Sequence, residues 1–178
     1  LTEEAQAIMG LIPQLDENFD KAIAMIVNCK GKVIITGVGK SGHIGAKIAA
    51  TLSSTGTPSF FLNPLDAYHG DLGAIGTNDI VIAISNSGQT DELLRFIPML
   101  IHNEIPIIGM SGNPKSLLAK YSTVHINVAV EREACPLNLA PTSSTTAVLS
   151  MGDALAVALM TVRNFKPKDF AQFHPGGE

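Results

Sequence analysis

The chain has 178 residues, 46% of them hydrophobic, and a formal net charge of −4. This length suits one domain with a sizeable core, and the hydrophobic content excludes a largely disordered chain. The negative charge provides no basic surface for nucleic acid or for an anionic membrane, so neither is an expected partner. Two cysteines make no disulfide framework at this length, which favours a reducing, cytoplasmic location. Cys135 follows Glu131 and Glu133, whose charges should disfavour its thiolate, so we interpret it as structural.

Hydrophobic periodicity predicts the elements in chain order. Apolar residues at helical spacing indicate a helix over 3–28, with a possible break at 10–13. Short apolar runs predict strands at 32–36, 58–62, 79–84, 105–110 and 123–128. The remaining helices are expected at 41–54, 91–103, 114–119, 143–163 and 167–173, with Pro114 in the first turn of its helix.

The run 147–162 is apolar enough to suggest a membrane span. Asp153 interrupts it, and it falls short of the ~20 residues that a span requires. We therefore expect a core or subunit-interface helix here.

Continuous apolar strands separated by helices indicate a parallel sheet that is covered on both faces. The prediction is an α/β fold: a three-layer doubly wound sandwich with a five-stranded parallel sheet in the flavodoxin-like order 2-1-3-4-5. One domain should occupy 1–178, with the N-terminal helix of 1–30 packing on an α/β core of 31–178.

The segment Ser85–Thr90, here called the phosphate loop, follows the apolar run 80–84 and precedes the helix that begins at Asp91. The first amides of a helix lack partners within the helix and favour an anion. A simple N-cap would need one polar residue, whereas this loop offers Ser85, Asn86, Ser87 and Thr90. The excess favours a phosphate site.

The segment Gly37–Gly42 matches G-x-G-x-x-G, which alone is a weak motif. A dinucleotide site needs an acid after the second strand, and 60–64 contains none. A P-loop would need a glycine where Ile34 stands. What remains is a glycine turn that brings Lys40 and Ser41 to a ligand beside the phosphate loop, although Lys40 alone would often be a solvated surface lysine.

These features together resemble the sugar isomerase (SIS) domain family and, more closely, its arabinose-5-phosphate isomerases. The resemblance runs over nearly the whole chain from about Asn18. It is carried by Gly39–Gly45, Ser54–Pro58, His69–Gly73, Glu133–Leu137, Leu139–Thr145, Met151–Ala156 and His174–Gly177.

The resemblance implies interconversion of D-ribulose 5-phosphate and D-arabinose 5-phosphate, which feeds Kdo synthesis for lipopolysaccharide or capsule. It implies a homo-oligomer, typically a tetramer, with active sites between subunits and no cofactor. The functional residues of the family fall on Lys40, His69, Glu92, Glu133 and His174. The substrate and phosphate positions fall on Ser41, Gly56, Thr57, Ser85, Asn86, Ser87 and Thr90.

Two departures from the family pattern stand out. Many relatives continue into a pair of CBS domains, which this chain lacks, so it is either truncated or a natural single-domain form. Relatives often have a zinc-associated histidine where this chain has Asn63, so we expect no metal site.

Isomerisation through an enediol needs a base near the two carbons, a proton donor for the oxygens and stabilisation of the oxyanion. Glu133 is the leading base, with a pKa expected to be raised, but a surface pairing with Arg132 or Lys47 is the alternative. Glu92 also suits an ordinary helix start. His69 and His174 could transfer protons between the substrate oxygens. The alternatives are that His69 is an ordinary loop histidine and that His174 belongs to a frayed C-terminal tail. The rival functions are an isomerase for another sugar phosphate and a non-catalytic phosphosugar-binding regulatory module.

Overall fold

The computed structural model describes residues 1–174 and 176. At its centre is a five-stranded sheet in the order β2-β1-β3-β4-β5, and all four strand pairs are parallel. The predicted order 2-1-3-4-5 is therefore confirmed. The strands are β1 (Val33–Gly37), β2 (Ser59–Phe61), β3 (Ile80–Ile84), β4 (Ile107–Ser111) and β5 (Val124–Asn127).

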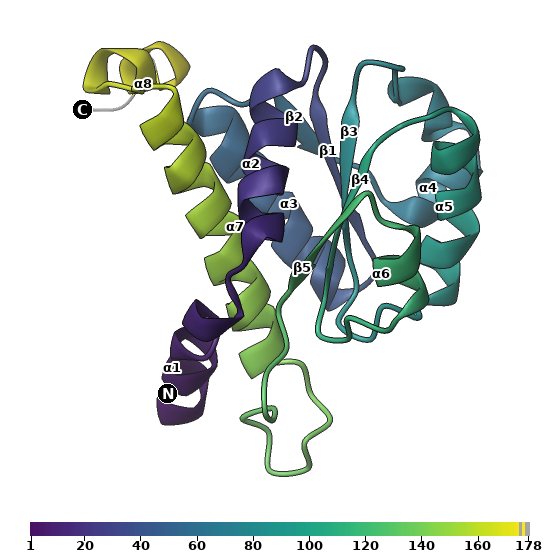
Figure 1. Ribbon diagram of the computed structural model, residues 1–178, viewed down its shortest axis with the longest axis vertical. Coiled ribbons are helices and arrows are strands. Elements are labelled where there is room, and N and C mark those ends of the chain that lie inside the picture. The colour runs from purple at the N-terminus through teal and green to yellow at the C-terminus, as the bar shows by residue number, and fades with distance from the viewer. Residues whose placement is uncertain (175, 177–178) are drawn as a thin grey trace.

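Helices cover both faces of the sheet, because successive apolar residues of each strand point to opposite sides. Ile35 and Ile82 pack with helices α2 (Glu17–Asn28), α3 (Lys40–Ser54) and α7 (Ser143–Val162). Ile34 and Val81 pack with α4 (Pro64–Tyr68), α5 (Asp91–His102) and α6 (Leu117–Tyr121). The result is the predicted three-layer sandwich (Figure 1).

The N-terminal segment divides where the sequence indicates a break. It forms α1 (Thr2–Met9), the 3-10 turn η1 (Ile12–Gln14) and then α2. Asp16 begins α2, and its carboxylate accepts the backbone N–H of Asn18 at 2.8 Å. α1 lies against α7 at one end of the molecule, and α2 packs against α7 and β5 (Figure 1).

α7 is long and apolar enough, by length and composition, to cross a membrane. Its 20 residues agree with the helix predicted at 143–163, and they include more than the apolar run 147–162 that was judged too short to span. In this domain its inner side is buried in the core through Met151, Leu155 and Leu159. Gly152 permits close contact with α3, because a Cβ there would lie 2.5 Å from Ile48.

Two parts of the secondary structure differ from the prediction. The helix expected at 114–119 is α6, which begins later because the Ser116 hydroxyl accepts the N–H of Ala119 at 3.2 Å and caps it. The segment after β2 contains α4 and the 3-10 turn η2 (Asp71–Ala74), which are too short to give a periodic signal.

Three helices that matter for function begin at the edge of the sheet where the strands end. α3 follows β1 and α5 follows β3 after short loops, whereas α7 follows β5 after the longer connection 128–142. α7 then runs to the opposite end of the molecule, where α8 (Pro167–Phe173) lies (Figure 1).

Candidate active site

Two hydroxyls of the phosphate loop hold the loop itself in shape. The Ser85 hydroxyl lies 2.8 Å from that of Thr90 and accepts the backbone N–H of Gly88 at 3.0 Å. The Ser87 hydroxyl accepts the N–H of Gln89 at 3.1 Å. Ser85 is buried, whereas Asn86 and Ser87 are exposed. The excess of polar residues in this loop is thus explained partly by folding and partly by exposed groups available to a ligand.

The helices on either side of this edge begin without a side-chain cap in the described part of the chain. Thr90 precedes α5 and Gly39 precedes α3, and neither first turn receives a side-chain hydrogen bond. Gly39 has φ +59°, a conformation that favours glycine. Lys40 and Ser41 are the first residues of α3, and Lys40 is exposed. Two open helix starts on neighbouring strands are suited to binding one anion.

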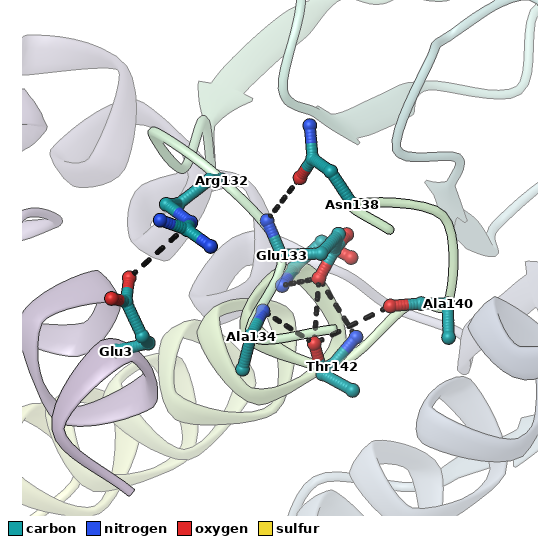
Figure 2. A network of polar contacts seen from close by, with 8 residues as sticks. Glu3, Arg132, Glu133, Ala134, Asn138, Ala140 and Thr142 are labelled. Carbon is teal, nitrogen blue, oxygen red and sulfur yellow. Dashed lines mark hydrogen bonds and ion pairs between the residues drawn. The ribbon is translucent and has the colours of Figure 1, made fainter. Parts of the chain in front are cut away.

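The start of α7 is closed by the protein itself (Figure 2). The Glu133 carboxylate reaches over from the loop 131–142, and its Oε2 accepts the backbone N–H groups of Thr142 and Ser144 at 2.8 and 3.1 Å. The Thr142 hydroxyl donates to the same oxygen at 3.1 Å. Asn138 holds the backbone of Glu133 in place, because its Oδ1 accepts the Glu133 N–H at 2.7 Å. Glu133 therefore serves as the anion at this helix start.

This capping reverses one expectation from the sequence. Burial acts to raise the pKa of Glu133, but hydrogen bonds from Ser144 and Thr142 outweigh burial and hold the pKa below its usual value. The predicted rise in pKa was wrong, because the sequence does not reveal the donors of α7.

The surface pairings proposed as an alternative for Glu133 are not formed. Lys47 pairs with Asp153 at 2.5 Å, and Arg132 pairs with Glu3 at 3.7 Å. Glu133 is instead 9% exposed and directed at the helix start. Its geometry is that of a fixed site residue rather than of a solvated surface charge.

Two cavities lie between the phosphate loop and the elements around it. A small cavity of about 40 Å³ lies between Ser41 of α3, Asn86 of the phosphate loop and Ser144 of α7. A larger one of about 280 Å³ is lined by Asn86, Glu133 and Asn138, among others. Asn86 borders both hollows, so the phosphate loop, α3 and the Glu133 loop surround one region.

Ser144 was missing from the predicted site residues. It is 2% exposed and lines the small cavity, and its side chain and its N–H both help to hold the pKa of Glu133 low. The polar run 142–146 at the start of an apolar helix was the available signal.

Comparison with known proteins establishes the family. A family model described as the SIS domain matches residues 25–158. The chain belongs to the SIS domain family.

Similar proteins include arabinose 5-phosphate isomerases. One, named KdsD, from Francisella tularensis, is 56% identical over 177 residues, which cover 98% of this chain and 54% of the relative. KdsD of Yersinia pestis is 54% identical over 174 residues, covering 98% and 53%. The chain spans about half the length of these curated relatives. The solved structure of E. coli CFT073 c3406 in complex with A5P matches with a TM-score of 0.95 and 42% identity, covering 98% of this chain and 93% of that one.

Not all predicted site residues of this SIS domain lie at the phosphate loop. Gly56 and Thr57 precede β2, at the edge where the strands begin. The Thr57 hydroxyl accepts a hydrogen bond from Arg163, and a Cβ on Gly56 would lie 2.9 Å from the ring of Phe165. Within one chain this turn packs against the end of α7 and contacts no part of the phosphate loop.

The two predicted histidines are also separated from Glu133. His174 lies at the end of α8, where it stacks on Phe170 with ring centroids 3.8 Å apart and bonds the Phe170 carbonyl. α8 and the loop that carries Glu133 lie at opposite ends of α7 (Figure 1). His69 is exposed at the end of α4, in the helical layer on the other face of the sheet. Of the motif His174–Gly177, Pro175 and Gly177 lie outside the described residues.

Glu92 lies at the edge of the sheet where β3 ends, the same edge as the phosphate loop. It is exposed in the first turn of α5 and forms no ion pair with Lys40 in the part of the chain that is described. Its position stabilises the start of α5, and its role in substrate binding stays a prediction.

Cys135 differs from its expected state. The backbone amides of Ala140, Leu139 and Leu137 donate hydrogen bonds that lower the pKa of its thiol, so the expectation of a disfavoured thiolate was wrong. The acidic neighbours in sequence were a poor guide, because the loop turns its amides toward the sulfur.

The position linked with zinc in relatives has another use here. Asn63 caps α4, and its side-chain oxygen accepts the N–H of Leu65 at 3.0 Å. Within residues 1–174 and 176, no group of three or more His, Cys, Asp or Glu side chains could hold a metal ion.

Proposed function

We propose that this SIS domain is an aldose–ketose isomerase that interconverts D-ribulose 5-phosphate and D-arabinose 5-phosphate through an enediol, without a cofactor. The observation that carries the proposal is the pair of open helix starts beside a cavity that also holds the fixed carboxylate of Glu133. The activity for which the KdsD relatives are named and the A5P complex of the E. coli protein support this choice of substrate.

The phosphate of the substrate binds at the phosphate loop and Ser41. There the amides at the starts of α3 and α5, together with exposed Asn86 and Ser87, supply hydrogen-bond donors. Lys40 adds the positive charge that an acidic chain needs locally. This arrangement directs the sugar toward the hollow that Glu133 lines.

Glu133 is the proposed base. It removes the proton from C2 of the aldose, the electrons form the C1–C2 double bond of the enediol, and the same proton returns to C1 to give the ketose. Since its pKa is held low, Glu133 is ionised at neutral pH and can accept the proton directly. The hydrogen bonds from α7 to Oε2 fix the direction of Oε1.

Proton transfer between O1 and O2 requires further groups, which we assign to His69 and His174 of a second copy, with Gly56 and Thr57 as its substrate contacts. Support comes from their separation from Glu133 within one chain. Exposed apolar side chains near His174, including Val162, Phe170 and Phe173, favour burial against another subunit. We therefore propose a homo-oligomer, with a tetramer as the expected form, acting in the cytoplasm on the pathway to Kdo.

The proposal is tested by mixing purified protein with arabinose 5-phosphate in D₂O and following the sugar by NMR. We expect ribulose 5-phosphate to appear, with slower or no conversion of ribose 5-phosphate and of fructose 6-phosphate. Binding of arabinose 5-phosphate without turnover would contradict the enzyme proposal and favour a regulatory binding module. Faster turnover of another sugar phosphate would contradict the assigned substrate.

A further inference from the structure

Three polar side chains form a connected cluster next to Gly88 of the phosphate loop. Ser111 ends β4, Ser116 caps α6, and His125 belongs to the edge strand β5. The Ser111 hydroxyl lies 2.8 Å from Nε2 of His125 and 3.3 Å from the Ser116 hydroxyl, and it donates to the Asn113 carbonyl at 3.0 Å. Both serines are fully buried. We call these three residues the supporting network.

The Ser111 hydroxyl has four polar neighbours. The carbonyl of Asn113 accepts from it and the N–H of Asn113 donates to it at 3.4 Å, whereas His125 and Ser116 can each act as donor or acceptor toward it. Burial lowers the pKa of His125 more than the nearby Asp16 raises it, so the ring is neutral at neutral pH. Loss of His125 would leave the buried Ser111 hydroxyl without one of its hydrogen-bond partners.

The supporting network touches the phosphate loop at Gly88. Gly88 has φ +64°, and a Cβ there would lie 2.1 Å from the Ser116 hydroxyl and 3.3 Å from Cβ of Ser111. The Gly88 carbonyl accepts the N–H of Leu118 at 3.1 Å, and its own N–H donates to Ser85. Gly88 is thus held on one side by α6 and on the other by the hydroxyl that shapes the loop.

We propose that His125, Ser111 and Ser116 are positioning residues for sugar-phosphate binding. His125 and Ser111 hold Ser116, and with it α6, against Gly88, and this contact fixes the shape of the phosphate loop. The inference rests on the proposed function in taking this loop as the phosphate site. The network acts on the loop and touches neither the sugar carbons nor Glu133. Its loss should therefore weaken phosphate binding much more than it slows the chemical step.

The test compares five variants of the full chain. H125L removes the ring nitrogen that bonds Ser111, S111A removes the central hydroxyl, and H125Q places an amide, which can donate or accept, where the ring stood. S116A removes the group that contacts Gly88. S122A is the matched control: its hydroxyl donates to Leu118 in the same helix at 2.6 Å but does not contact the phosphate loop. For each, KM and kcat are measured with arabinose 5-phosphate, Kd with inorganic phosphate, and Tm.

We expect H125L, S111A and S116A to raise KM and the phosphate Kd about tenfold, with kcat within about twofold, the size expected for one lost buried hydrogen bond. H125Q should recover most of the affinity, and S122A should lower Tm without changing KM. If H125L fails to fold, H125N replaces it, since the shorter amide does not reach Ser111.

Lowered Tm with unchanged KM and phosphate Kd in H125L and S111A would overturn the proposal and leave the network a purely structural role. Equal losses in S122A would overturn it as well. Phosphate binding by the wild-type protein distinguishes failure of the proposed phosphate site from failure of the supporting network. Failure to bind inorganic phosphate would overturn the phosphate site itself, whereas normal binding with unaffected variants would overturn the network alone.

Discussion

The two ends of α7 have opposite chemistry. At its start, Glu133 caps the helix, Ser144 is buried, and the phosphate loop lies across a small cavity. At its other end, Phe170 of α8 stacks on His174, and Gly56 packs against Phe165. A helix of this length separates the two groups by about 30 Å.

This contrast shows that the predicted site residues form two sets that one chain does not bring together. The first set holds open hydrogen-bond donors and a fixed carboxylate, which suits binding and proton abstraction. The second presents a histidine amid exposed apolar surface, which suits contact with another protein. The predictions below test whether these two sets act in one reaction.

The largest effect is expected for Glu133→Gln. The amide keeps an oxygen for the amides of α7 but cannot accept the C2 proton, so kcat should fall by roughly 10²–10⁴-fold. Steady-state assays with arabinose 5-phosphate measure this. Glu104→Gln, at an exposed residue before β4, is the control and should behave like the wild-type protein. A Glu133→Gln enzyme with normal kcat would remove Glu133 from the chemistry.

His174→Ala should come next. Because His174 stacks on Phe170, bonds its carbonyl and lies at the end of the short helix α8, its loss should leave Tm nearly unchanged. As a proton shuttle supplied to another copy, its loss should lower kcat about 100-fold. Assays of activity and Tm on the same preparation separate the two effects, and unchanged activity would place His174 outside the site.

A smaller change is expected for Thr90→Val, which removes the hydroxyl that bonds Ser85 across the phosphate loop. The loss of about 1–1.5 kcal/mol should raise KM for arabinose 5-phosphate roughly five- to tenfold and affect kcat less. Thr161→Val, on the outer side of α7, is the matched control. Equal KM values for both variants would contradict the assigned phosphate site.

The smallest effect concerns stability and pH. The pKa of Glu133 is lower in the folded protein than its ordinary value of 4.5, so the ionised carboxylate stabilises the fold above that value. This contribution is lost as pH falls through the lowered pKa. Urea unfolding should therefore show wild type more stable than Glu133→Gln at pH 7, with a difference that shrinks toward pH 3. A constant or growing difference would contradict the capping role.

The sequence predicted the strands and nearly all helices, because these depend on local hydrophobic pattern, and the sheet order followed from the doubly wound fold class. It did not predict the pKa of Glu133, since the donors come from Thr142 and Ser144, about ten residues later. Nor did it show that Gly56 lies far from Ser85 in the fold. Motifs identify which residues act in a family, but only the three-dimensional arrangement shows which of those residues lie close together within one chain.

The most direct test of a shared site is complementation between two inactive variants. Glu133→Gln and His174→Ala chains, with different tags, are expressed together, and oligomers that carry both tags are purified. If each site takes Glu133 from one copy and His174 from another, random mixing rebuilds about a quarter of the sites, and about a quarter of wild-type kcat should return. Mixed oligomers that stay as inactive as either parent would contradict the shared site.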